Sequence, residues 1–267
     1  MAKGVARVRE TEVAYDDAGS GAAVVLLHGF PFDRSMWREQ AQALSGTCRV
    51  VAPDLRGQGE TPLGDVTLTM GEMAEDVAAL LDELGLERVV LGGLSMGGYV
   101  AFEFYRRFPQ RVRALVLADT RPQADTDEAQ RTREESAQKV LREGMEPLTD
   151  SMLPKLLSPA TREGKLDVVE RVRAMMLATK PEGAAAALRA MAVRRDQTDL
   201  LASIDVPTLI LVGGEDPITP PSDAEAMAEK IKGARLVRIE GAAHLSNVER
   251  PEEFKRALTE FVGGLPS

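Results

Sequence analysis

The chain is poor in the residues that form disulfides and metal sites. Its 267 residues include one cysteine and two histidines. Cys48 alone cannot form a disulfide within the chain, and its position beside an apolar run predicts a buried thiol. Because the histidines and the cysteine stand at unrelated positions, the sequence predicts no metal site and implies no cofactor. It also lacks the Gly-Lys-Ser/Thr loop of a nucleotide site.

Basic residues and long apolar runs are also scarce. The 33 Lys and Arg residues face 42 Asp and Glu residues, which gives a formal net charge of −9. This excess of negative charge disfavours a surface that follows phosphates, so we expect no nucleic-acid partner. No apolar run is long enough to span a membrane, and the N-terminal residues lack the apolar core of a signal peptide. We therefore expect no membrane partner and a cytoplasmic location, while the sequence does not distinguish a monomer from a dimer.

What the sequence does contain is a series of short apolar runs that alternate with helical patterns. Continuous apolar runs bounded by turn residues are typical of strands buried on both faces of a sheet. Strands that alternate with helices pair in parallel, because each helix returns the chain to the same end of the sheet. We therefore predict an α/β fold with a mostly parallel central sheet of about eight strands, flanked by helices and edged by an antiparallel hairpin. The predicted strands are 5–8, 12–15, 24–27, 48–53, 88–91, 112–118, 206–212 and 235–239, and the predicted core helices are 70–84, 96–108, 222–231 and one that begins at 251.

The stretch from Val90 to Tyr99 joins a predicted strand to a predicted helix through one serine, Ser95. Gly93 and Gly97 flank this serine, two residues away on either side. The order strand, Gly-x-Ser-x-Gly, helix matches a nucleophile elbow, in which a sharp turn holds a serine hydroxyl above a sheet. Glycines suit such a turn because the backbone bends too tightly for ordinary side chains. The pattern favours a nucleophile over a glycine-rich loop with an incidental serine.

A serine nucleophile needs a base, and the base needs a carboxylate to orient it. The carboxyl ends of parallel strands meet at one edge of a sheet, so residues from distant strand ends can supply both. Only His28 and His244 are available as the base, and the backbone beside His28 has another plausible task, so we predict His244. For the carboxylate we predict Asp216, which follows a strand and lies between serine and histidine in the chain. Asp119, at the end of the strand after the Ser95 helix, is the alternative.

Between residues 122 and 195 the pattern changes to helices without a buried strand. Apolar residues at helical spacing mark one helix over 166–176, and an alanine-rich helix follows over 181–191. We predict that this segment is an insertion in a core domain made of 1–121 and 196–267. The insertion lacks Phe, Trp, Tyr and His, and we expect its methionines to fill contacts between helices, with one or two of them lining a pocket. These methionines are Met145, Met152, Met175, Met176 and Met191.

Five segments in this order resemble those of the α/β-hydrolase superfamily, and within it the esterase and lactonase group. The resemblance covers essentially the whole chain and implies an α/β-hydrolase fold in which residues 122–195 form a helical cap over the active site. One departure is Gln58, at a position where many relatives have histidine, and it concerns a minor structural contact. The five segments are His28–Pro31, Asp54–Gly59, Gly93–Gly98, Asp216 before Pro217, and Gly241–His244.

The resemblance also implies an oxyanion hole formed by the backbone N–H groups of Phe30 and Met96. This is physically reasonable, because Met96 begins a helix whose free N–H groups favour negative charge. The neighbouring apolar residues suggest a modest apolar pocket for the acyl group of the substrate. The predicted substrate-binding residues are Gly29, Phe30, Trp37, Met96, Met145 and Leu156.

The predicted function is a carboxylesterase that hydrolyses short- to medium-chain esters, with a small-molecule ester as its partner, through Ser95, His244 and Asp216. A lactonase similar to 3-oxoadipate enol-lactonases, or a perhydrolase, is the alternative within the enzymes. A lactone that carries carboxylates would require cationic residues in the pocket, and the sequence does not place Arg121, Arg194 or Arg195 there. A ligand-binding module on the same fold is the alternative outside the enzymes.

Overall fold

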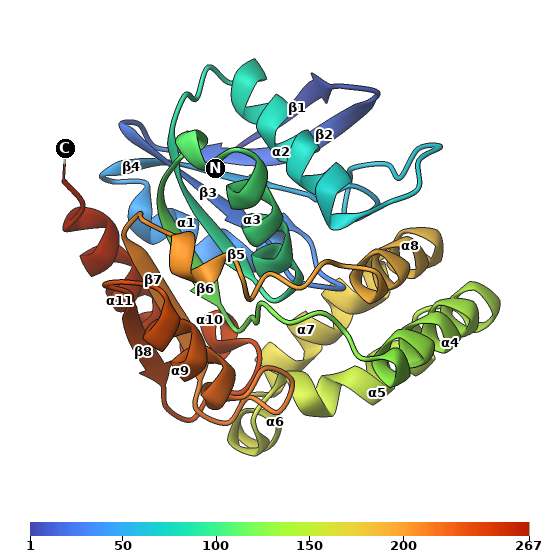
Figure 1. Cartoon of the computed structure of the whole chain (residues 1–267). Coiled ribbons are helices and arrows are strands. Elements are labelled where there is room, and N and C mark those ends of the chain that lie inside the picture. Colours follow the sequence, from blue (N-terminus) through green and yellow to red (C-terminus); the bar gives the residue numbers. More distant parts are fainter. Residues whose placement is uncertain (267) are drawn as a thin grey trace.

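The computed structural model describes residues 1–266 and contains one eight-stranded sheet with the order β1-β2-β4-β3-β5-β6-β7-β8 (Figure 1). The β1–β2 hairpin is antiparallel and lies at one edge, and β2 pairs antiparallel with β4. All pairings from β4 to β8 are parallel. The predicted fold class is therefore confirmed. The strands are β1 (Ala2–Val8), β2 (Thr11–Ala18), β3 (Ala22–Leu27), β4 (Cys48–Pro53), β5 (Val89–Leu94), β6 (Val112–Ala118), β7 (Thr208–Gly213) and β8 (Arg235–Ile239).

The central strands are apolar on both sides because helices cover both faces of the sheet. Along β3, Val25 and Leu27 belong to the buried cluster on one face, and Val24 and Leu26 belong to the cluster on the other. This alternation follows from the two-residue repeat of a strand. Cys48 is a buried free thiol, as predicted.

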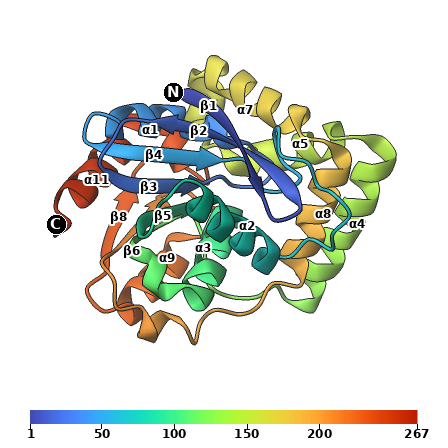
Figure 2. The same cartoon turned by 90° about the horizontal axis from the view of Figure 1, so that it is seen from above.

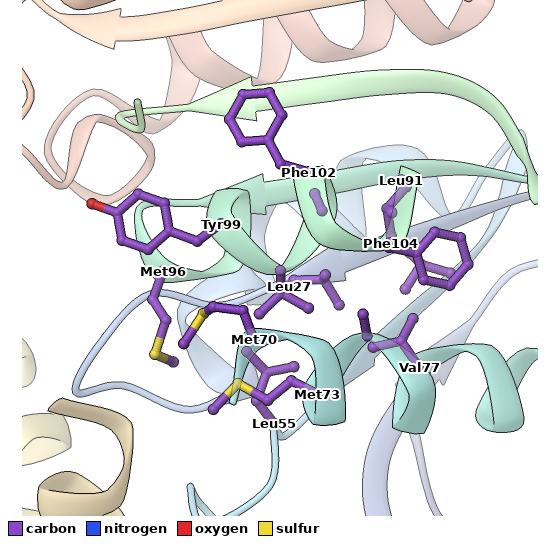
Figure 3. Packing of buried hydrophobic residues seen from close by; sticks show 14 of the residues in the cluster. Leu27, Leu55, Met70, Met73, Val77, Leu91, Met96, Tyr99, Phe102 and Phe104 are labelled. Carbon is purple, nitrogen blue, oxygen red and sulfur yellow. The ribbon is translucent and has the colours of Figure 1, made fainter. Parts of the chain in front are cut away.

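Helices α2 and α3 pack together against one face of the sheet, while α1 and α11 pack together against the other (Figure 2). Figure 3 shows Leu27 of the sheet with Met73 and Val77 of α2 on one side and Phe104 of α3 nearby, and all four belong to one buried cluster. Helix α2 begins where the sequence predicts, because the Thr69 hydroxyl accepts a hydrogen bond from the Glu72 N–H. The core helices are η1 (Arg34–Trp37), α1 (Arg38–Leu44), α2 (Met70–Glu83), α3 (Met96–Arg107), η2 (Pro109–Arg111), η3 (Leu201–Ser203), α9 (Pro221–Lys230), α10 (Ser246–Glu249) and α11 (Pro251–Gly263).

Five further helices lie between β6 and β7 in the chain, and all of them fall within the predicted insertion, residues 122–195. Helix α4 packs against α8, and α5 contacts both α4 and α7 (Figure 1). The division of the chain into a core and a cap stays a prediction. Within residues 1–266, no helix combines the length and the apolar character that crossing a membrane requires. The inserted helices are α4 (Asp127–Glu143), α5 (Glu146–Leu156), α6 (Pro159–Gly164), α7 (Leu166–Ala178) and α8 (Pro181–Ala192).

Strand β5 continues three residues beyond the predicted end, up to the serine turn. Gly92 and Gly93 remain paired with β3 on one side and β6 on the other. A side chain at Gly93 would overlap the backbone of Gly97, and one at Gly97 would overlap the Leu27 carbonyl oxygen. The two glycines therefore let α3 begin directly against the strands, which no apolar pattern reveals.

We expect Gly97→Ala to destabilise the protein by about 1–3 kcal/mol or more, because the added methyl group meets backbone that cannot move aside. Gly46→Ala is the matched control, since a Cβ there would have no neighbour within 4 Å. We expect that control to change the free energy of unfolding by no more than about 0.5 kcal/mol. Urea unfolding of both variants measures the difference, and equal stabilities would contradict the close packing of α3.

Candidate active site

Ser95 stands between β5 and α3 in a strained backbone conformation, with φ 54° and ψ −113°. A positive φ at a residue other than glycine is unfavourable, and such strain concentrates at functional sites. Hydrogen bonds from the neighbouring strand end hold the turn. The Ser95 N–H donates to the Ala118 carbonyl oxygen at 2.9 Å, and the Thr120 hydroxyl donates to the Ser95 carbonyl oxygen at 2.9 Å. The serine side chain is thereby held on a rigid support.

His244 lies between Ser95 and Asp216. Its Nε2 atom is 2.8 Å from the Ser95 Oγ atom, and its Nδ1 atom is 2.8 Å from Asp216 Oδ2. These contacts suit a neutral imidazole whose Nδ1–H donates to the carboxylate while Nε2 accepts from the serine hydroxyl. The structure thus brings together the three residues predicted to be catalytic, from the ends of β5, β7 and β8.

Asp216 is held by more donors than the sequence analysis identified. Its Oδ1 atom accepts from the backbone N–H groups of Ile218 and Thr219, and its Oδ2 atom accepts from the Thr219 hydroxyl at 2.7 Å. Pro217 has no N–H, so the donors come from the two following residues. Aspartate followed two or three residues later by a donor is a known turn pattern, and this signal could have identified Thr219.

Burial by itself lowers the pKa of His244, but the charge of Asp216 and its hydrogen bond outweigh this effect, so the pKa is raised. Burial raises the pKa of Asp216, but the charge and hydrogen bond of His244 outweigh it in turn, and the pKa is lowered. Each partner therefore stabilises the charged form of the other. An imidazole with a raised pKa accepts the serine proton more readily.

Asp119, the alternative acid, has other partners. Its Oδ1 atom accepts from the Gly213 N–H at 2.8 Å, and its Oδ2 atom accepts from the Ser246 hydroxyl at 2.5 Å. No hydrogen bond joins it to His244 within residues 1–266. The position of Asp216 therefore matches that of an orienting carboxylate, and the position of Asp119 does not.

His28 lies away from Ser95 and joins two loops. Its Nδ1 atom is 2.9 Å from the Gly29 carbonyl oxygen, and its Nε2 atom accepts from the Leu55 N–H at 2.9 Å. Burial lowers its pKa, which favours the neutral ring that these bonds require. Gln58, the departure from the family pattern, donates to the Gly183 carbonyl oxygen of α8 at 3.1 Å. The loop after β4 is therefore tied to an inserted helix.

The loop that contains Phe30 lies against the serine turn. A Cβ at Gly29 would lie 3.3 Å from the Leu94 carbonyl oxygen and 3.5 Å from the Ser95 Cβ atom. The backbone N–H groups of Phe30 and Met96 donate no hydrogen bond within the described chain, residues 1–266. Both donors are available to a ligand beside Ser95, as an oxyanion hole requires.

A cavity of about 550 Å³ adjoins the candidate site at Phe30 and Arg121 and extends between α4, α5 and α8. Of the six predicted substrate-binding residues, only Phe30 lines this cavity. Trp37 packs against Phe254 with ring centroids 5.9 Å apart in the buried core, and Leu156 belongs to the same cluster. The other three predicted residues, Gly29, Met96 and Met145, are buried and do not line it either.

The cavity is lined by apolar side chains, among them Met152 of the insertion, and by charged side chains of both signs. Arg133 of α4 and Lys155 of α5 line it together with Arg121 and several hydroxyl groups. The helices turn polar faces as well as apolar residues towards it. Arg194 is directed elsewhere, since it pairs with Asp125 at 2.6 Å and lies over the ring of Tyr99. The sequence alone does not show which way these side chains point.

A buried glutamate that the sequence analysis did not identify supports the histidine loop. Glu249 accepts hydrogen bonds from the Ala243 N–H at 2.6 Å and from the Ser158 N–H at 2.8 Å. It therefore connects the residue before His244 to the start of α6. Nothing in its sequence context separates it from the exposed glutamates around it.

Among residues 1–266, no group of three or more His, Cys, Asp or Glu side chains is placed to hold a metal ion.

The sheet, the serine turn and the hydrogen-bonded Ser95, His244 and Asp216 define a hydrolase-type site. Comparison with known proteins agrees with this class. The profile of the alpha/beta hydrolase fold family matches residues 22–251, and the chain belongs to this family.

One relative and two solved structures resemble this chain over most of its length. The 3-oxoadipate enol-lactonase 1 of Acinetobacter baylyi is 32% identical over 90% of this chain and 88% of its own. The structure of a thermophilic esterase from Thermogutta terrifontis, with malate bound, has a TM-score of 0.96 at 42% identity and covers 100% of both chains. The enol-lactonase of Burkholderia xenovorans LB400 has a TM-score of 0.91 at 30% identity, over 97% of this chain and 100% of its own. The similarity to esterases and enol-lactonases supports the assignment of this chain as a hydrolase.

We expect Asp216→Asn to lower kcat about a thousandfold or more, because the amide cannot hold the histidine tautomer that the serine needs. The pH dependence should also change. With His244 as the base, its raised pKa should place the acidic limb of kcat/KM in the native protein above the ordinary histidine value of about 6.5. Without the carboxylate this limb should move to lower pH. A pH–rate profile measures the shift, exposed Asp150→Asn is the control, and an unmoved limb would contradict the role of Asp216.

Proposed function

We propose that the protein is a carboxylesterase that hydrolyses short- to medium-chain carboxylic esters through an acyl-enzyme at Ser95. The observation that carries this proposal is the chain of two 2.8 Å contacts from Ser95 through His244 to Asp216. Serine alone is a weak nucleophile, and this arrangement supplies its base and the group that orients the base. The 42% identity to the Thermogutta terrifontis esterase gives independent support.

In the proposed mechanism, the Ser95 Oγ atom attacks the ester carbonyl carbon while His244 Nε2 takes the hydroxyl proton. The negative charge that develops on the carbonyl oxygen faces the free N–H groups of Phe30 and Met96. The C–O bond to the alcohol then breaks, and His244 returns the proton to the leaving oxygen. Water, activated by the same histidine, cleaves the acyl-serine to release the acid and restore the Ser95 hydroxyl.

The inserted helices fit the role of a cap in this proposal. Gln58 ties α8 to the loop after β4, and the cavity beside Phe30 is walled by α4, α5 and α8. Substrate would enter between these helices and the sheet edge. The length and polarity of the accepted ester would then depend on the insertion, while the core would perform the reaction.

We expect Ser95→Ala to fold normally and to hydrolyse a short p-nitrophenyl ester at least about a thousandfold more slowly than the native protein. A fluorophosphonate should label the native protein at Ser95 and leave the variant unlabelled. Ser203→Ala, which removes an exposed hydroxyl distant from the site, should retain full activity. Full activity of the Ser95 variant would refute the mechanism, and an unlabelled native protein would favour a ligand-binding module.

A second candidate function is hydrolysis of an anionic lactone, and the cations of the cavity favour it. Arg121 lies where the cavity meets the site, and its Nε atom is buried without a hydrogen-bond partner in residues 1–266. Its nearest acidic neighbour, Asp125, lies 3.7 Å away and is already paired with Arg133 and Arg194. Arg121 therefore has the capacity to bind a substrate carboxylate. The enol-lactonases among the relatives are consistent with such a substrate.

We expect Arg121→Leu to raise KM about tenfold or more for a carboxylate-bearing lactone, because a charge-assisted hydrogen bond is lost. The same variant should leave the KM for a neutral short-chain ester nearly unchanged. Arg142→Leu, which removes an exposed cation of α4 outside the cavity, is the control. If Arg121→Leu affects neutral and anionic substrates equally, Arg121 does not recognise an anion and the lactonase candidate loses its support.

A further inference from the structure

Asp119 is a buried residue with a strained backbone that the proposed mechanism does not use. It directly follows β6, its side chain is fully buried, and its φ of 43° lies in the left-handed region. Only three non-glycine residues in the described chain, residues 1–266, have a positive φ, and the others are Arg9 and Ser95. Strain of this kind persists where surrounding interactions hold it, and its presence beside Ser95 suggests a role in the site.

The contacts of Asp119 join the three loops that carry Ser95, Asp216 and His244. The residues on either side of it bind the backbone of Ser95, as described above. Its own carboxyl group accepts from Gly213, three residues before Asp216, and from Ser246, two residues after His244. A single side chain thus connects the acid loop to the histidine loop, beside the serine turn.

The surroundings of Asp119 disfavour a negative charge. In residues 1–266 its side chain has two neutral donors and no hydrogen bond or ion pair from Lys or Arg. The titratable groups that act on it are Asp216 after β7 and His244 after β8. Arg121, two residues further along, exerts its charge on His244, which already has the Asp216 carboxylate as its ion-pair partner. A second carboxylate ion would be buried without a counterion of its own.

We propose that Asp119 is a neutral carboxylic acid that acts as a positioning residue, holding the His244 loop against the Asp216 loop without adding a second charge. A protonated carboxyl fits its contacts, because Oδ1 accepts from the Gly213 N–H, and the Ser246 hydroxyl, which donates to Oδ2 of a carboxylate, would instead accept the Oδ2–H across the same 2.5 Å. Burial and the charge of Asp216 raise the pKa of Asp119 to about 8, which is consistent with this state at neutral pH.

Neutrality would also matter for His244. An ionised Asp119 would raise the pKa of His244 further than Asp216 already does. The imidazole would then hold its proton at neutral pH and could not accept one from Ser95. A neutral Asp119 keeps the positioning contacts and leaves Asp216 as the one carboxylate whose charge raises the pKa of His244. This inference rests on the proposed function for its catalytic consequence, but the protonation state can be tested without substrate.

The first test is the pH dependence of stability in the native protein and in Asp119→Asn, which has the shape of the neutral acid but does not titrate. In the unfolded chain an aspartate loses its proton near pH 4, whereas folded Asp119 would keep it up to about pH 8. The unfolded state then binds fewer protons, so rising pH favours unfolding of the native protein relative to the variant.

Urea unfolding at pH 5, 6, 7 and 8 gives the equilibrium constant for folding of each protein. As the pH rises, this constant should fall for the native protein relative to Asp119→Asn. The fall should approach about tenfold per pH unit, which corresponds to one proton. Asp76→Asn is the matched control, because Asp76 is also buried but pairs with Arg56, and we expect no such trend there. A constant ratio for Asp119→Asn would show that the carboxyl is ionised throughout this range and would overturn its neutrality.

The second test separates positioning from general stability. We expect Asp119→Asn to keep kcat within about threefold of the native value with an unshifted acidic limb, and Asp119→Ala to lower kcat about ten- to hundredfold at similar KM. Ser246→Ala, which removes only the contact to the histidine loop, should also lower kcat. Native kcat in Asp119→Ala and in Ser246→Ala would overturn the positioning role.

A spectroscopic measurement keeps this result independent of the proposed function. With two histidines in the chain, the proton on Nδ1 of His244 can be assigned by NMR and reports its bond to Asp216. We expect this signal unchanged in Asp119→Asn and shifted or lost in Ser246→Ala and Asp119→Ala. If the native protein hydrolyses no ester, the esterase proposal fails, while the NMR and unfolding results still decide the role of Asp119.

Discussion

The strained backbone of Ser95 is the constraint on which the arrangement of the site depends. A residue with a side chain is held at φ 54° because glycines on both sides let α3 begin directly against β5 and β3. The strand next to β5 then supplies the hydrogen bonds that hold the turn, through Ala118 and Thr120. The elbow is therefore a property of three packed strands and a helix together, and the five-residue motif is its visible part.

The remaining chemistry follows from how the fold distributes charge around a buried imidazole. His244 is enclosed, which by itself would lower its pKa, and the charge and hydrogen bond of Asp216 are the largest effects that raise it. The four donors on Asp216, His244 included, keep that carboxylate ionised in spite of its burial. Asp119 lies close by with neutral donors only. Two aspartates at adjacent strand ends thus differ in pKa, because Asp216 is bound to His244 and Asp119 is not.

Much of the fold could be predicted from the sequence, because buried parallel strands and capped helices are recorded in local patterns of apolar and turn residues. The positions of Ser95, His244 and Asp216 relative to one another could be predicted as well, because parallel strands bring their carboxyl ends to one edge. The true end of β5 could not, because Gly92 and Gly93 carry no apolar signal although both are paired on either side. The partners of Asp119 and the contact of Glu249 with Ser158 could not be predicted either, since each joins residues more than ninety positions apart in the chain.

The cavity shows where sequence reasoning is weakest. Of the insertion residues expected in an apolar pocket, Met145 and Leu156 are buried in the core, whereas Leu148 and Met152 line the cavity together with cationic side chains. A helix of the insertion has one face towards the core, another towards the cavity and a third towards solvent, and periodicity separates only apolar from polar. A cation in the cavity and a cation in solvent therefore look alike in the sequence. Under the proposed function, the residues of the reaction stand at strand ends, which sequence patterns reveal, whereas substrate choice would depend on helix orientation, which only the packed structure determines.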